Sequence, residues 1–221
     1  MSISNFKIRA DQELIELRDE VMSLATDSDI YWKVQRDVIQ HNGRLLTMRS
    51  AFFDMLNDAY AHATASRIRR LVDRDSRTIS LRRLVEELMS YPDAFEGKCT
   101  LRDLQNDLSS LDETCRRVKD YVDQFVAHHE RNSTAGVPTF HELNAAIEKI
   151  IAVFKRCYSI LRNTDTAVVV SYLEDPLAIF AFPWITDKSR TLEQMVSEIT
   201  PQNQHPEVVW GPAVGREKIE S

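Results

Sequence analysis

The sequence predicts an all-α protein, and three observations lead to this expectation. Glycine is scarce, at 5 of 221 residues, and the charged residues, 28% of the chain, fall at helical spacings. Apolar residues make up 43% of the chain and recur in several long segments at steps of three and four, the period of a helix with one buried face. We therefore expect an antiparallel helical bundle of four to five main helices with a short C-terminal extension.

The first third of the chain carries three helical patterns. A helix is predicted over residues 11–25, and the sequence TDSD that follows supplies turn and N-cap residues, so a second helix should begin near Ile30. Asn42-Gly43 is expected to break or kink the second helix, and a third pattern runs over residues 44–72. The apolar faces of the first and third patterns contain Leu14, Ile15, Leu17, Val21, Met22, Leu24, Leu45, Met48, Phe52, Met55, Leu56, Ile68 and Leu71.

The middle of the chain contains two helix-start signals. Ser80 is placed to cap a short helix with the sequence LRRLVEELM, and the sequence YPDAFEGKC after it is expected to form a connection. Thr100 and Asp103 have the spacing of a capping box, and the helix that they open is predicted to reach Arg131. Its buried face should contain Leu101, Leu104, Leu108, Leu111, Cys115, Val118, Val122 and Phe125.

A second capping box, Thr139 with Glu142, starts the last predicted long helix, which ends near Arg162. Beyond residue 165 the helical pattern weakens, and from Pro201 the sequence is polar and contains Pro and Gly. The inward face of the last helix should contain Leu143, Ile147, Ile150, Ile151, Phe154 and Leu161. We expect three regions along the chain: a helical bundle over 1–165, a C-terminal packing segment over 166–200 and a flexible tail over 201–221.

The bulk composition favours a cytoplasmic protein. The formal net charge of -6 argues against a protein that coats nucleic acid non-specifically, although a local basic groove stays compatible with it. No apolar run approaches the roughly 20 residues that a membrane helix needs, and the N-terminus lacks a signal-length apolar core. Three widely spaced cysteines suit a reducing compartment better than a disulfide framework: Cys99, Cys115 and Cys157.

Two adjacent histidines, His128 and His129, lie near the end of the helix that is predicted to reach Arg131. At about 100° per residue, one line beside the apolar face carries Arg117, Tyr121, Gln124, His128 and Arg131. His129 falls closer to the apolar face, and Lys119 forms an i, i+4 pair with Asp123 elsewhere on the helix.

Several kinds of chemistry fit this stripe. An imidazole exchanges a proton near neutral pH, and guanidinium groups hold phosphate through two hydrogen bonds, so the stripe suits metal-free RNA cleavage by a 2′-hydroxyl. A polar stripe ending in HHERN is also typical of a solvated C-terminal helix end, where cations suit the helix dipole. Adjacent histidines point about 100° apart and share no metal-ligand spacing, so neither a metal site nor a cofactor is predicted.

A second group, Arg36, Asp37 and His41, offers an alternative site in the sequence RDVIQH. The arginine and the carboxylate precede the histidine by five and four residues, which is compatible with nuclease chemistry. An exposed helix surface accounts for the same spacing. Both interpretations stay open at this point.

The order of segments resembles the AbiU-type branch of the HEPN superfamily, which is linked to bacterial abortive infection. YWKVQRDVIQ is similar to the early helix of the family, and RIRRLVDRDSRTISLRRLVEEL to its arginine-rich helix, aspartate turn and following helix. DYVDQFVAHHERN resembles the family segment R-[ND]-K-x-x-A-H-x-D. FHELNAAIEKIIAVFKRCYSILR and LEDPLAIFAFPWI resemble the last long helix and a terminal aromatic segment. Together these stretches cover most of residues 10–185.

The resemblance implies a HEPN bundle, commonly a homodimer, and a metal-independent endoribonuclease in active members. Carried over residue by residue, His128 matches the motif histidine and Asp123 the polar residue after the motif arginine, whereas Val122 occupies the arginine position. A valine cannot donate to a phosphate. Either another arginine replaces it, with Arg117 and Arg131 the best candidates and Arg36 an outsider, or the protein is catalytically silent.

Three functions follow as alternatives. The first is an RNA-targeting protein of phage defence or of a toxin–antitoxin system, in which His128 acts as acid–base catalyst and Arg131 or Arg117 holds phosphate. Tyr121, Gln124, His129 and Lys119 would then contact RNA. The second is a non-catalytic module that binds RNA or a partner. The third is a helical scaffold for a protein encoded in the same operon, without a membrane role.

Overall fold

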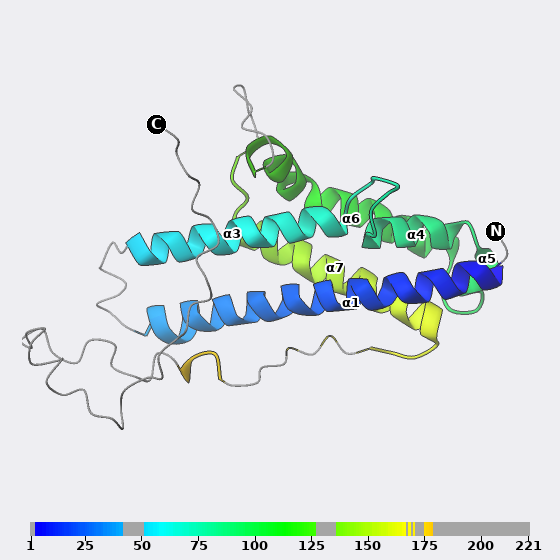
Figure 1. The fold of residues 1–221 in the computed structure, drawn as a ribbon, viewed down its shortest axis with the longest axis horizontal. Helices are drawn as coiled ribbons and strands as arrows, with labels where there is room; N and C mark the ends of the chain where they lie inside the picture. The colour runs from blue at the N-terminus through cyan, green and yellow to red at the C-terminus, as the bar shows by residue number, and fades with distance from the viewer. Residues whose placement is uncertain are drawn as a thin grey trace, which may run out of the picture. The chain divides into compact units, whose positions relative to one another are not determined.

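The computed structural model describes residues 3–41, 51–126, 136–166, 168, 170 and 175–178, all of which belong to one compact unit, Met1–Ile179 (Figure 1). Within these ranges the secondary structure is entirely helical, as the sequence predicted. The predicted packing segment and tail, residues 166–200 and 201–221, lie almost wholly outside the described residues and stay predictions.

The first helix is longer than the sequence suggested. Helix α1 spans Ile3–Lys33 and continues into a π-helical segment, η1, at Val34–Ile39. The predicted turn at TDSD was therefore wrong. Its aspartates have partners outside their own backbone: Asp27 pairs with Arg67 of the next long helix, and Asp29 pairs with Lys33 at 3.1 Å. A side chain that bonds elsewhere does not compete with the helical backbone, so the helix continues.

Three later helices begin directly after the capping residues that the sequence analysis identified. Ser80 accepts a hydrogen bond from the Arg83 backbone at 3.2 Å, and both predicted capping boxes are present, at Thr100 and at Thr139. The predicted connection after the short helix contains one more helical turn. The elements are α3 (Ala51–Leu71), α4 (Leu81–Met89), α5 (Pro92–Phe95), α6 (Leu101–Tyr121), η2, a second π-helical segment (Val122–Val126), and α7 (Phe140–Arg162).

The four long helices run alternately in opposite directions, as Figure 1 shows, which confirms the antiparallel bundle. Helix α7 packs against α1, α3, α4, α5 and α6. The largest fully buried side chains come from several of these helices and form one core: Phe6, Leu14, Leu24, Ile68, Leu81, Leu84, Leu88, Leu104, Leu111, Leu143, Ile150 and Phe154.

Some residues of the predicted apolar faces do not enter this core. Phe52 and Met55 are 54% and 58% exposed, because the residues that α3 buries begin only at Tyr60. Ile15 and Leu101 are 41% and 44% exposed, and Leu101 is the first residue of α6. Leu45 and Met48 lie outside the described residues.

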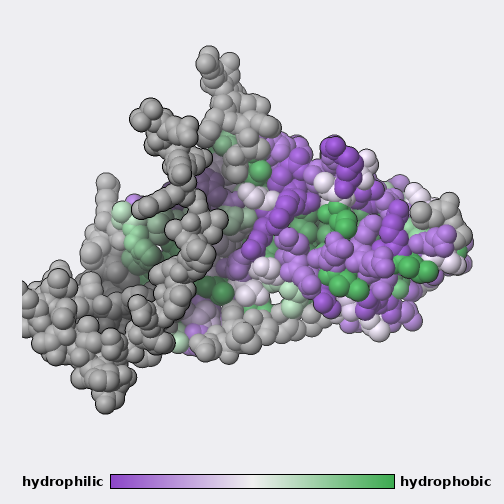
Figure 2. Space-filling view, in the orientation of Figure 1, coloured by the Kyte–Doolittle hydropathy of each residue, from purple (hydrophilic) through white to green (hydrophobic). Residues whose placement is uncertain are grey.

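The surface of the described helices is mainly hydrophilic on the side shown in Figure 2, with separate small apolar patches. Cys115 and Cys157 are buried and Cys99 is half-buried, and all three are free thiols. None of the described helices is both long enough and apolar enough to span a bilayer.

Burial predicts different costs for two phenylalanines of this chain. Phe154→Ala should lower the free energy of unfolding by about 3–5 kcal/mol, because it empties a fully buried site in α7. Phe52→Ala, at a side chain 54% exposed, should cost less than about 1 kcal/mol. Urea unfolding followed by circular dichroism measures both. Equal losses would contradict the assignment of α7 to the centre of the core.

Candidate functional site

The segment that carries the predicted site begins in the last turn of α6 and continues through η2. Tyr121 and Val122 are buried, at 4% and 7% exposure, and both belong to the core. The buried position of Val122 agrees with its place on the predicted apolar face. His128, His129 and Arg131 lie outside the described residues, and their predicted roles stay predictions.

Asp123 is held by two cations. Arg69 of α3 donates from Nε to Oδ1 of Asp123 at 2.6 Å, and Lys119 of α6 donates from Nζ to Oδ2 at 2.9 Å. The latter is the predicted i, i+4 pair. Arg69 also contacts Asp73 through its second guanidinium nitrogen, at 2.9 Å from Asp73 Oδ1. One arginine therefore joins the end of α3 to η2.

These contacts control the ionisation of the two carboxylates. Burial is the largest single influence on Asp123 and raises its pKa, but the hydrogen bonds from Arg69 and Lys119 and their positive charges outweigh burial. The pKa of Asp123 is consequently lower than its ordinary value of 3.8. Asp73 follows the same pattern: hydrogen bonds from Arg69 and from the following backbone lower its pKa against the opposing effect of burial.

Helix α3 presents a second polar residue to the same segment. The exposed imidazole of His62 stacks on Tyr121 with ring centroids 5.9 Å apart and an interplanar angle of 3°, and Tyr121 in turn contacts Phe125 at 5.6 Å. His62 and Arg69 are seven residues apart, two helical turns, so they project from one side of α3.

A family model named AbiU2, of the HEPN type, matches residues 11–177. The chain belongs to the HEPN AbiU2 family. This family is one of abortive-infection, phage-defence proteins. No curated protein and no solved structure gives a significant match to the chain.

Sequence spacing predicted that Arg117 lies on the same helix face as His128, and in the structure its guanidinium contacts another helix, α7. Arg117 forms an ion pair with Glu142, the capping-box residue of α7, and its side chain is 56% exposed. No contact joins it to Asp123 or Tyr121 among the described residues. Gln124, predicted to bind RNA, is half-buried.

The alternative group lies at η1. Arg36 bonds Asp37 through two hydrogen bonds, of 2.6 and 3.0 Å, which raise the pKa of the guanidinium. His41 Nδ1 lies 2.8 Å from the Arg36 carbonyl oxygen. The structure thus brings the three predicted residues together, but the histidine meets the arginine backbone and not its guanidinium.

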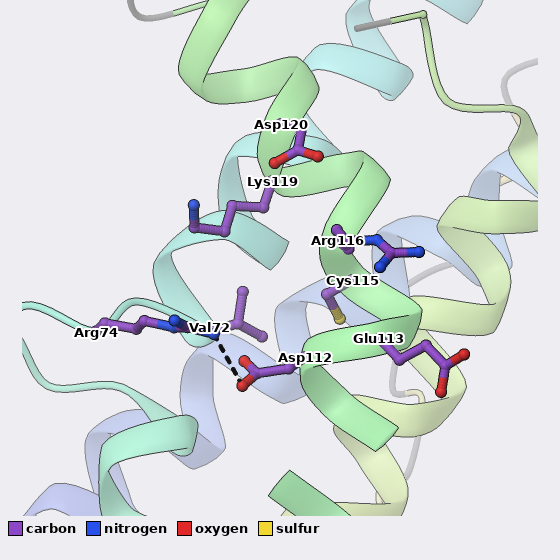
Figure 3. A pocket seen from close by; sticks show the side chains of 8 residues that line it. All are labelled: Val72, Arg74, Asp112, Glu113, Cys115, Arg116, Lys119 and Asp120. Carbon is purple, nitrogen blue, oxygen red and sulfur yellow. Dashed lines mark hydrogen bonds and ion pairs between the residues drawn. The ribbon is translucent and has the colours of Figure 1, made fainter. Parts of the chain in front are cut away.

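A pocket of about 460 Å³ adjoins the Asp123 cluster, and Lys119 belongs to both (Figure 3). Its ionisable lining is balanced, with three cations and three carboxylates. Arg74 and Asp112 both line it and form an ion pair with each other, with a nitrogen–oxygen distance of 3.0 Å (Figure 3). Cys115 also lines the pocket, but burial raises its pKa to about 12, so it is no thiolate nucleophile at neutral pH. The cationic lining residues are Arg74, Arg116 and Lys119.

No group of three His, Cys, Asp or Glu side chains with metal-binding geometry occurs in the part of the chain that the structure describes. Sequence reasoning missed Arg69 and His62 as members of the site. The sequence signal for Arg69 was the resemblance of RIRRL to the arginine-rich helix of the family, but its contact with η2 depends on how α3 and α6 pack.

The lowered pKa of Asp123 predicts a pH-dependent contribution to stability. A carboxylate with a depressed folded-state pKa contributes stability above its ordinary pKa and loses it as pH falls through the folded value. Asp123→Asn should therefore destabilise the protein at pH 7, by about 0.5–1 kcal/mol for this half-exposed pair. The difference from wild type should shrink below pH 3.8.

Urea unfolding of both proteins between pH 3 and pH 7 measures this difference. Asp19→Asn, at a carboxylate 70% exposed, is the control and should show little effect at either end. A penalty for Asp123→Asn that stays constant down to pH 3 would contradict the assignment.

Proposed function

We propose that this AbiU2-family chain acts on RNA in phage defence as a metal-independent endoribonuclease. The guanidinium of Arg69 would do the work of the motif arginine that Val122 replaces. One observation carries the proposal: a guanidinium from α3 lies against Asp123, the residue directly after the degenerate motif position. In this proposal the charged group that spacing alone placed at 117 or 131 would come from another helix.

The geometry of Arg69 suits phosphate recognition. Its Nε and one terminal nitrogen are used by Asp123 and Asp73, and these bonds fix the plane of the guanidinium. The other terminal nitrogen donates to no described group and is available to a phosphate oxygen. Arg69, Lys119 and the two carboxylates sum to zero charge, so directed hydrogen bonds, and not net attraction, would supply the affinity.

The proposed reaction uses the RNA's own 2′-hydroxyl. His128 would remove its proton as the oxygen attacks the adjacent phosphorus, and Arg69 would stabilise the extra negative charge on the phosphoryl oxygens. The bond to the 5′-oxygen then breaks, and that oxygen takes a proton from water, while His128 returns its own proton to the solvent. The products are a 2′,3′-cyclic phosphate and a free 5′-hydroxyl.

Incubation of purified protein with total RNA in EDTA tests this reaction. Wild type should cleave, and His128→Ala and Arg69→Met should each lower the rate by about 10²-fold or more. His141→Ala, at an exposed histidine on α7, is the matched control and should leave the rate unchanged. Cleavage that does not depend on His128, or its complete absence in folded wild type, would reject the proposal.

The burial of Val122 favours a second candidate, a HEPN module that binds RNA or a partner without cutting. At 7% exposure, Val122 packs in the core and presents nothing to a substrate. This candidate predicts that wild type binds a labelled RNA in fluorescence anisotropy but leaves it intact, and that Val122→Arg gains cleavage if it folds.

Burying an arginine there is costly, so circular dichroism must accompany the assay. Wild-type cleavage as fast as that of Val122→Arg would contradict the silent module. A homodimer and an operon-encoded partner stay predictions from sequence.

A further inference from the structure

The fold leaves one side of α3 uncovered. Helix α3 packs against α1, α6, α7 and η2, and its buried residues lie on the side that faces them. On the opposite side its two largest apolar side chains, Phe52 and Met55, are 54% and 58% exposed. These two residues are three positions apart and are therefore neighbours on the helix surface. A contiguous apolar patch of this kind on a protein surface marks a contact surface.

Small residues continue the line of these two side chains along α3. Ala59 and Ala63 follow Met55 at steps of four and are exposed, and Ser66, three residues further, is half-buried. Positions at steps of three and four share one face of a helix. This outer face, Phe52 to Ser66, has two bulky apolar side chains at one end and a shallow strip beyond them, over about 21 Å. Small side chains at a contact let a second helix approach closely.

The two apolar side chains differ in how far they are held in place. The phenyl ring of Phe52 meets that of Phe53 edge to face, with centroids 5.5 Å apart and an interplanar angle of 71°. Phe53 is half-buried, so this contact restricts the exposed ring. The side chain of Met55 is flexible, and methionine adapts to irregular partners at binding surfaces. The outer face thus combines one oriented ring with one adaptable side chain.

One edge of the outer face is acidic. Asp58 lies three residues after Met55, and Asp54 lies four residues before Asp58, so both carboxylates border the apolar pair. Both are exposed, and neither forms an ion pair or a hydrogen bond with a described residue. Residues 51–66 contain no lysine and no arginine. The outer face therefore has no cation of its own to balance these two carboxylates.

We propose that the outer face of α3 binds a basic amphipathic helix of a partner protein. Leucine or isoleucine side chains of that helix, at steps of three and four, pack on Phe52 and Met55 and over the small residues beyond them. Lysine or arginine side chains along its edge pair with Asp54 and Asp58. The inference does not rest on the ribonuclease proposal, because it uses none of the residues assigned to that reaction.

A second copy of this chain fits the outer face less well than a basic helix does. A two-fold axis would bring the same face of two copies together, since such an interface uses one patch twice. Because residues 51–66 contain no lysine or arginine, the carboxylates of both copies would then lie at the contact without a basic counter-charge. Each copy also carries a formal net charge of -6, which adds long-range repulsion. The charge distribution therefore favours a cationic partner.

Two synthetic helical peptides of about 20 residues, or about 30 Å of helix, test the inference. Both carry the same leucine stripe, and one has lysine and the other glutamate along the edges of the stripe. Fluorescence anisotropy of each labelled peptide, titrated with the full chain, should give saturable binding of the lysine peptide. The glutamate peptide should bind at least about tenfold more weakly. Added salt should narrow this difference, because it screens the exposed carboxylates.

Substitutions of the apolar pair locate the binding surface. Phe52→Ala combined with Met55→Ala should weaken binding of the lysine peptide by about tenfold or more, because the variant lacks both apolar anchors. Ile8→Ala, at a side chain 65% exposed on α1, is the matched control and should leave binding unchanged. All three positions are exposed, so the variants should fold, and circular dichroism checks that they do.

Substitutions of the carboxylates test the charge of the partner. Asp54→Asn combined with Asp58→Asn should reduce the preference for the lysine peptide over the glutamate peptide several-fold, by about the amount that added salt does. Glu16→Gln, at an exposed carboxylate of α1, is the matched control and should leave the preference unchanged.

Absence of saturable binding of the lysine peptide would overturn the proposal, as would equal binding of the two peptides or binding that survives the change at Phe52 and Met55. Sedimentation velocity examines the second copy as occupant. A wild-type dimer that dissociates in the double alanine variant would assign the face to self-association and would also overturn the proposal. His128→Ala should bind the lysine peptide as tightly as wild type does, so a failure of catalysis and a failure of this surface are separable results.

Discussion

Burial of the apolar side of α7 is the constraint on which the rest of the structure depends. This one helix packs against α1, α3, α4, α5 and α6, and its buried residues recur at steps of three and four along its length. Each fully buried large side chain contributes about 1.5–3 kcal/mol, whereas an exposed ion pair contributes about 0–1 kcal/mol. The many ion pairs of this chain therefore act on a bundle that the core has already assembled.

The core also determines which polar groups meet at the family segment. Ile68 and Leu71 are buried, and they fix how α3 is rotated about its axis. Arg69 lies between them at the border of the buried surface, and from there its guanidinium reaches Asp123 in η2. The same rotation presents His62 to Tyr121. The candidate site is thus a consequence of packing between two helices, and neither helix contains it alone.

Local signals predicted the fold well because they act through local contacts. Thr100 and Thr139 cap their helices through residues three positions away, and such bonds depend little on the rest of the chain. The turn predicted at TDSD was wrong because both of its aspartates form ion pairs while the helix continues through them. Asp27 pairs with Arg67, which is 40 residues away along the chain, and Asp29 pairs with Lys33.

The polar stripe was harder to predict because it assumed an uninterrupted α-helix. The segment at 122–126 is π-helical, with bonds between residues five apart, so a period of 100° per residue does not extend across it. Arg117 forms an ion pair with Glu142 of α7, and its predicted place on the face of His128 stays a prediction. The hydrogen bond from Arg69 to Asp123 depends on the contact between α3 and η2, which no spacing within one helix predicts.

The three cysteines have a practical consequence for work on this protein. Burial raises the pKa of Cys115 and Cys157 to about 12, and it also raises the pKa of Cys99, which alone of the three keeps a partly accessible thiol. A maleimide dye applied to the folded chain will react at Cys99 before the other two. The native sequence therefore already carries a single attachment point, two residues before the start of α6, for fluorescence studies without engineered residues.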